Sequence, residues 1–152
     1  MLKACICRSA SVMMLFTAIL VFALTASAGD QVPFKGEADE VITGTESLPD
    51  GLHITVFTTG QATHLGRFTR EASAVLQPDG VVVGTLVWTA ANGDQLFANL
   101  EAGFVSPTTA VGTYTFVGGT GRFENASGEA DFETVTSDGI HFLLTFEGTI
   151  GF

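Results

Sequence analysis

Apolar and polar residues alternate along most of the chain, and a period of two is typical of β-strands with one buried face. In the segment 140–148, for example, Phe142, Leu144 and Phe146 share one face. Thr, Val, Phe and Gly are abundant, whereas extended helical periodicity is absent. The pattern predicts eight strands, at 32–42, 52–61, 67–76, 81–89, 95–104, 111–117, 128–136 and 140–148.

Short turn signals separate these segments and predict how the strands connect. Pro78-Asp79-Gly80, Asn92-Gly93 and Ser137-Asp138-Gly139 are typical of tight turns between antiparallel neighbours. About eight strands joined in this way can close into a barrel, which removes exposed sheet edges. The sequence therefore predicts an all-β fold, an antiparallel eight-stranded closed β-barrel. A two-sheet β-sandwich has the same periodicity and remains the alternative.

The first 28 residues differ from the rest and have the pattern of a secretory signal peptide. Lys3 and Arg8 precede an apolar run at 12–24, and Ala26-Ser27-Ala28 is a small-residue cleavage site. The run is shorter than the roughly 20 residues of a membrane span, although an uncleaved anchor is the alternative. We expect a cleaved signal peptide at 1–28 and one barrel domain at 29–152, secreted or periplasmic, without stable membrane insertion after cleavage.

Charge and cysteine placement narrow the function classes. The net charge is −10, and removal of Lys3 and Arg8 with the signal would make it −12, which disfavours nucleic-acid partners. Both cysteines, Cys5 and Cys7, precede residue 29. The exported domain therefore has neither a disulfide nor a cysteine-based metal site or nucleophile.

The most distinctive segment is the glycine-rich corner Gly118-Gly119-Thr120-Gly121. It lacks the residues and the strand–helix context of dinucleotide-binding and P-loop motifs. Because glycine accepts positive φ angles, the segment predicts a tight corner between two late strands. We expect Phe123 to plug one barrel end, covered by a short helical turn.

The stretch 118–128 is followed by two alternating strands, the second of which ends with the segment 142–148, and this region resembles the allene oxide cyclase and dirigent barrels. In that family a Gly-Gly-Ser/Thr-Gly-x-Phe-x-x-Ala-x-Gly stretch joins late strands. The segments 63–69 and 91–94 are also similar to secreted bacterial proteins with this barrel. The resemblance covers about 111–151. The residues that match the family motif one by one have a structural role only, and they are Gly118, Gly119, Gly121, Phe123, Ala126 and Gly128.

The resemblance implies an eight-stranded barrel around an apolar cavity, often in dimers or trimers. Plant members cyclise an unstable fatty-acid epoxide or steer the coupling of phenolic radicals, in both cases without a cofactor. The cyclase uses a buried glutamate in an early strand. Glu37 and Glu40, in the first predicted strand, are therefore candidate catalytic acids.

Further candidates come from the residues themselves. Glu101 alternates with Phe97 and Asn99, so it is a buried acid if that face points inward and a solvated charge if it points outward. Arg67 and Arg70 flank Phe68 and could hold the carboxylate of a ligand such as a fatty acid, or pair with surface acids.

His64 lies at a strand junction, either as a ligand-binding group or as a hydrogen-bond partner of the turn. The three histidines lack metal-binding spacing. The shared face of Glu129, Asp131 and Glu133 is either a solvated acidic face or a calcium site, since Ca²⁺ takes several oxygen ligands. We expect no metal and no cofactor.

The sequence favours an exported, non-enzymatic barrel that binds a small apolar or carboxylate ligand or acts as an interaction module, since no convergent catalytic set is present. The alternatives are a cofactor-free isomerase or cyclase of the allene oxide cyclase type, and a structural protein that assembles as a homo-oligomer.

Overall fold

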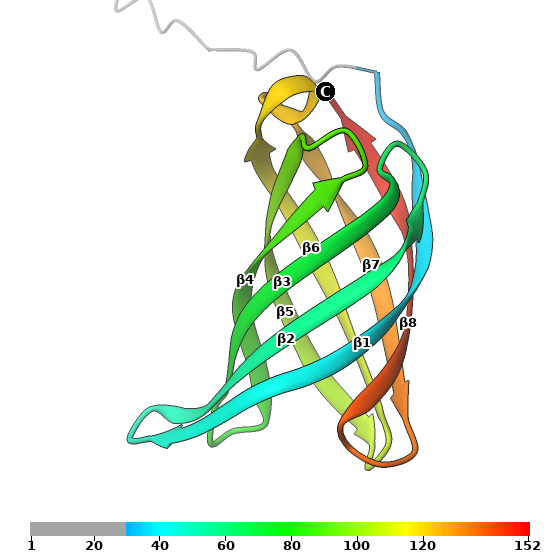
Figure 1. Ribbon diagram of the computed structural model, residues 1–152. Coiled ribbons are helices and arrows are strands. Elements are labelled where there is room, and N and C mark those ends of the chain that lie inside the picture. Colours follow the sequence, from blue (N-terminus) through cyan, green and yellow to red (C-terminus); the bar gives the residue numbers. More distant parts are fainter. Residues whose placement is uncertain (1–29) are drawn as a thin grey trace, which may run out of the picture.

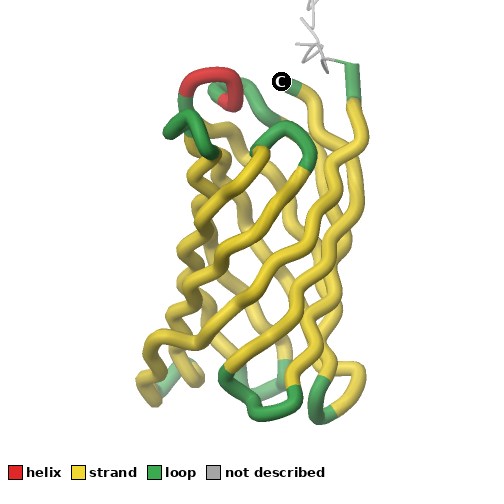
Figure 2. Tube along the Cα trace, turned by 45° about the vertical axis from the view of Figure 1, so that its right-hand side comes forward, coloured by secondary structure: helices red, strands yellow, loops and turns green. Residues whose placement is uncertain are grey.

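The structure, a computed structural model, describes residues 30–152 and shows a closed barrel of eight antiparallel strands (Figures 1 and 2). Each strand pairs with its neighbours in chain order, and β1 pairs with β8 to close the ring. The strands are β1 (Val32–Leu48), β2 (Gly51–Ala62), β3 (Gly66–Leu76), β4 (Val81–Ala90), β5 (Gln95–Ser106), β6 (Thr109–Gly119), β7 (Ser127–Thr136) and β8 (His141–Gly151).

The closure of β1 onto β8 confirms the barrel and excludes the sandwich. All eight strands lie where the alternation places them, but β1 continues six residues beyond the predicted end at residue 42. A register shift between Ile42 and Gly44 takes up one extra residue, Thr43, and the strand goes on pairing with β2 as far as Leu48. The predicted signal peptide, 1–28, lies outside the described residues. Within residues 30–152, no helix is long and apolar enough to cross a membrane.

Even-numbered residues point into the barrel along almost every strand, as the alternating burial shows. The registers keep this face continuous from strand to strand by pairing even positions with even positions, except beyond the shift after Ile42. The β2–β3 and β4–β5 turns lie at the end where both described termini lie, and Ala91 donates its backbone N–H to the carbonyl of Leu65 there. We call this the closed end. The opposite end, where the β1–β2, β3–β4, β5–β6 and β7–β8 turns lie, is the open end (Figure 1).

The closed end is sealed by the short 3₁₀ helix η1 (Gly121–Phe123), which confirms the predicted corner and plug. Phe123 is fully buried, as are Phe34 and Leu96. The Asp94 carboxylate in the β4–β5 turn accepts a hydrogen bond from the Arg122 backbone N–H at 3.4 Å. This contact ties the helix to the neighbouring turn and holds the plug in place.

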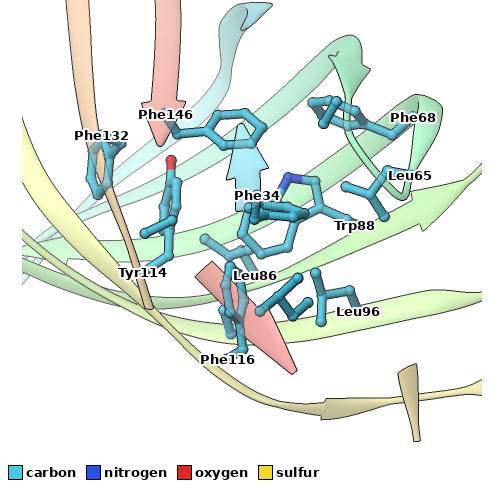
Figure 3. Packing of buried hydrophobic residues seen from close by; sticks show 14 of the residues in the cluster. Phe34, Leu65, Phe68, Leu86, Trp88, Leu96, Tyr114, Phe116, Phe132 and Phe146 are labelled. Atoms are coloured by element: carbon cyan, nitrogen blue, oxygen red, sulfur yellow. The ribbon is translucent and has the colours of Figure 1, made fainter. Parts of the chain in front are cut away.

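Aromatic rings fill the interior on the closed-end side (Figure 3). Tyr114 and Phe132 stack with their ring centroids 4.2 Å apart, and Phe34 lies 5.3 Å from Phe146. Gly36 makes room for this packing, since a Cβ there would lie 2.6 Å from Phe146 Cζ and from the Gln61 carbonyl oxygen. The close packing of the interior therefore requires glycine at positions that face a large aromatic ring.

Replacement of Gly36 by alanine is expected to destabilise the barrel by about 1–3 kcal/mol, because the new methyl group overlaps backbone as well as a ring. Gly103→Ala is the matched control: a Cβ there meets nothing within 4 Å, and its effect should stay within about 0.5 kcal/mol. Urea unfolding of both variants measures the difference. Equal stability of the two variants would contradict the packing described here.

Candidate functional site

A row of inward-facing residues crosses the barrel wall and includes the polar groups of the site. Glu40 on β1 pairs with Thr58 on β2, which pairs with Arg70 on β3, and Arg70 pairs with Trp88 on β4. Phe142 continues the row beyond Glu40 on β8, close to the start of that strand and so to the open end. Because the strands are tilted, the row rises from the open end at Phe142 toward the closed end at Trp88.

Arg70 is the centre of a hydrogen-bonded cluster inside the barrel. Its Nε donates to Thr58 Oγ1 at 3.1 Å, one Nη donates to the Tyr114 hydroxyl oxygen, and the other donates to the Glu40 carboxylate. Since Tyr114 belongs to β6, the guanidinium group connects opposite walls of the barrel. The side chain of Arg70 is 3% exposed and that of Glu40 is 11% exposed.

Burial and the facing groups set the protonation of this cluster. Burial opposes the charge of Arg70, but the facing Tyr114 oxygen and Glu40 carboxylate outweigh it and raise the pKa of the guanidinium. Burial also raises the pKa of Tyr114 to about 12, partly offset by Arg70. The cluster therefore consists of a cation, its carboxylate partner and a neutral phenol.

The interior is less buried toward the open end. Inward-facing side chains on that side are only partly buried, whereas those at the closed end are almost fully buried. The half-buried set comprises Ile42, Ile54, Val56, Leu100, Ala102 and Phe142. Small residues, Ala74, Gly84, Ala102 and Gly112, line one side of the interior there. These half-buried apolar residues, which we call the mouth, lie toward the Glu40 end of the row, and the Glu40 side chain is itself 11% exposed.

Among the candidate acids, Glu40 alone joins this cluster. Glu37 lies on the same strand but at an odd position, so its side chain is exposed on the outer wall. Glu101 is also exposed, because the face that carries Phe97 and Asn99 points outward.

Arg67 and Arg70 do not form a shared basic spot. The inward position of Phe68 places Arg70 inside the barrel and Arg67 on the exposed outer face. His64 lies at the closed end with a positive φ of 64°. Its Nε2 donates to the Pro33 carbonyl at 3.1 Å, as expected for a histidine that supports a turn.

The glycine-rich motif has a structural place far from the cluster. Gly118, Gly121 and Gly128 adopt positive φ angles, and a Cβ on Gly119 would lie 2.0 Å from the Gln95 carbonyl oxygen. Phe123 and Ala126 are buried. These residues shape the closed end and its plug.

The outer wall holds the other acidic candidates. Glu129, Asp131 and Glu133 are exposed on β7, where Thr113 donates a hydrogen bond to Asp131 at 2.9 Å. Within residues 30–152, no three histidine, cysteine or acidic side chains converge in a way that could hold a metal ion.

Three members of the site were not identified from the sequence: Thr58, Trp88 and Tyr114. A usable signal existed for Tyr114, the chain's one tyrosine, because alternation with Phe116 and Gly112 places its hydroxyl on an inward face. Its contact with Arg70 could not be inferred, since the two residues lie 44 positions apart on opposite walls.

Tyr114 should ionise with a midpoint near pH 12 in the folded protein, against about 10 in the unfolded chain. The folded-state pKa is the higher one, so the stabilisation is complete below about pH 10 and is lost as the pH rises toward 12. Because the chain has one tyrosine, tyrosinate absorbance reports this group alone. Tyr114→Phe should remove this alkaline loss of stability, while a midpoint near 10 in the folded protein would show that the hydroxyl is not buried.

Comparison with known proteins shows a shared fold. No family model and no curated protein matches the chain. The solved structure of the pterocarpan synthase dirigent protein GePTS1 is similar, with a TM-score of 0.59 and 15% identity over 93% of this chain and 98% of that one. The pterocarpan synthase dirigent protein PsPTS1 gives a TM-score of 0.53 and 14% identity over 80% of this chain and 94% of that one.

These similarities support the dirigent side of the resemblance seen in the sequence, while the relation to allene oxide cyclases stays a prediction. At such low identity the similarity extends to the fold and not to the activity. The chain has the same eight-stranded antiparallel β-barrel fold as these dirigent proteins, with a buried polar cluster in its interior.

Proposed function

We propose that this chain is an exported barrel that binds a small, largely apolar molecule through its open end. The polar atom of that molecule would face the cluster of Arg70, Glu40 and Tyr114. The observation that carries the proposal is a charged cluster in the barrel interior, with Glu40 still 11% exposed beneath an apolar mouth.

Energetic considerations support a binding role over a purely structural one. Taking Arg70 and Glu40 out of water costs free energy, and apolar residues of similar volume often stabilise a protein as well or better. Binding sites for small molecules, by contrast, combine apolar walls with a few well-placed polar groups. The fold adds support, because solved proteins named pterocarpan synthases have the same barrel.

A cofactor-free isomerase or cyclase is the second candidate function. It requires an inward-facing carboxylate, and Glu40 meets that requirement. Tyr114, whose pKa is raised to about 12, would keep its proton and could donate it to a developing negative charge. The substrate of such an enzyme would bind at the place proposed above for the ligand.

An assembly role rests on the outer wall. Phe57 pairs with Val41, and Leu143 pairs with Val135, so four adjacent strands carry exposed or half-exposed apolar side chains toward the open end. Leu143 is 66% exposed. A second copy of the chain would cover such a stripe in a homo-oligomer. Export rests on the signal-like pattern at 1–28.

Ala102→Phe tests the binding role by filling the mouth, because residue 102 faces inward between Tyr114 and the open end. Titration with a panel of fatty acids and simple phenols, followed by calorimetry and by Trp88 emission, should show binding to the wild-type protein. Affinity for any ligand that binds should fall at least about tenfold in the variant, which is a loss of roughly 1.4 kcal/mol.

Glu101→Phe is the matched control, since it adds the same ring one position away on the outer face. It should bind like the wild type. Binding that survives Ala102→Phe unchanged, or a complete lack of binding across the panel, would contradict a ligand site in the interior.

A further inference from the structure

The hydrogen bonds of Arg70 leave part of its binding capacity free. A guanidinium group has five N–H donors, and the structure gives Arg70 one bond from each of its three nitrogens. Each Nη therefore retains a second N–H. These donors lie in the barrel interior, where an unpaired donor costs free energy.

Two neighbouring side chains, Trp88 and Tyr114, also have a hydrogen-bond donor without a partner in the described part of the chain. The indole Nε1 of Trp88 is buried without a hydrogen-bond partner anywhere in residues 30–152, and Trp88 is the register partner of Arg70. The Tyr114 oxygen accepts from Arg70, so its own O–H remains available as a donor. The only acceptor that this cluster leaves without a hydrogen bond to another described residue is the second carboxylate oxygen of Glu40, against the two remaining Nη–H groups of Arg70, the Trp88 indole N–H and the Tyr114 O–H. This excess of donors suits a ligand oxygen that only accepts.

Charge in the same region is already balanced. The carboxylate of Glu40 neutralises the guanidinium of Arg70, and the phenol of Tyr114 is uncharged at neutral pH. A ligand carboxylate at this place would add a second anion beside Glu40, and like charges a few ångströms apart in a partly desolvated interior repel strongly. An uncharged carbonyl oxygen can accept the same hydrogen bonds without that repulsion.

We propose that this interior site selects ligands with an uncharged carbonyl oxygen over ligands with a carboxylate, and that Glu40 determines this selectivity. The inference rests on the proposed ligand-binding function and narrows it. It also reverses one expectation from the sequence, in which Arg70 was a candidate partner for a ligand carboxylate. The reversal follows from a single contact, the ion pair between Arg70 and Glu40.

Three probes of nearly equal size separate the contributions to binding: acetophenone, benzoate and ethylbenzene. All three carry one phenyl ring, which suits an aromatic interior. Acetophenone has an uncharged carbonyl oxygen, benzoate has a charged carboxylate, and ethylbenzene has no hydrogen-bond acceptor. Calorimetry on the wild-type protein at neutral pH should rank acetophenone first. Its affinity should exceed that of benzoate by roughly tenfold or more, given the Coulomb energies of nearby like charges.

Glu40→Gln tests the cause of the selectivity. Glutamine keeps an amide oxygen that can accept from Arg70 but removes the negative charge, so the cation is left for the ligand. Benzoate should gain about tenfold or more and should overtake acetophenone. Glu37→Gln, an exposed residue on the same strand, is the control and should keep the wild-type order.

Phe142→Lys gives an independent test should Glu40→Gln fold poorly. Residue 142 is half-buried at the open end and is the register partner of Glu40, so a lysine there can pair with that carboxylate. This variant should also shift preference toward benzoate. The wild-type ranking needs no variant at all.

The outcomes distinguish the two proposals. Benzoate binding as tightly as acetophenone to the wild-type protein, or an unchanged order in a folded Glu40→Gln variant, would overturn the selectivity while leaving the ligand site in place. If none of the probes binds and the fatty-acid and phenol panel also fails, the proposed function itself is overturned. Acetophenone first in the wild type, with benzoate first after Glu40→Gln, supports both.

Discussion

The placement of one buried cation, Arg70, organises the interior of this barrel. A guanidinium group that is 3% exposed needs hydrogen-bond acceptors from several directions, and it obtains them from β1, β2 and β6. These contacts link opposite walls through the interior. The side chain also divides the interior into two parts, with packed aromatic rings toward the closed end and half-buried apolar residues toward the open end.

This division follows from elementary constraints on a small closed sheet. An eight-stranded barrel has an interior just wide enough for side chains to fill it. The closed end uses that space for rings, sealed by Phe123 and the η1 corner. Near the open end, the inward-facing apolar side chains are only half-buried. A polar cluster at this boundary is shielded enough for strong electrostatics, and its Glu40 side chain is still 11% exposed.

Local patterns predicted the fold well, because alternation, Asn92-Gly93 and the glycine-rich corner act over a few residues each. Alternation from the inward Phe68 separates Arg67 from Arg70 on β3, and alternation from the buried Ala98 places Glu101 on the outer face of β5. The continuation of β1 past residue 42 was missed, since the register shift between Ile42 and Gly44 interrupts the alternation on which the prediction relied.

The meeting of Glu40 and Arg70, 30 positions apart, could not be inferred from local pattern alone. It depends on how the tilted strands align Glu40, Thr58 and Arg70 in one row. The contact of Arg70 with Tyr114 depends in addition on the closure of the barrel, which brings β3 and β6 to face each other across the interior. The sequence named Glu40 and Arg70 as separate candidates, but their contact depends on the long-range register of the strands.

A double-mutant cycle on Glu40 and Arg70, with methionine at each position, measures this central interaction most directly. Glu40→Met leaves a buried cation without its partner and should cost about 3 kcal/mol or more in urea unfolding. The double variant should be more stable than that single variant, with a coupling energy of about 1–3 kcal/mol between the two sites. Additive losses, with no coupling, would contradict an ion pair inside the barrel.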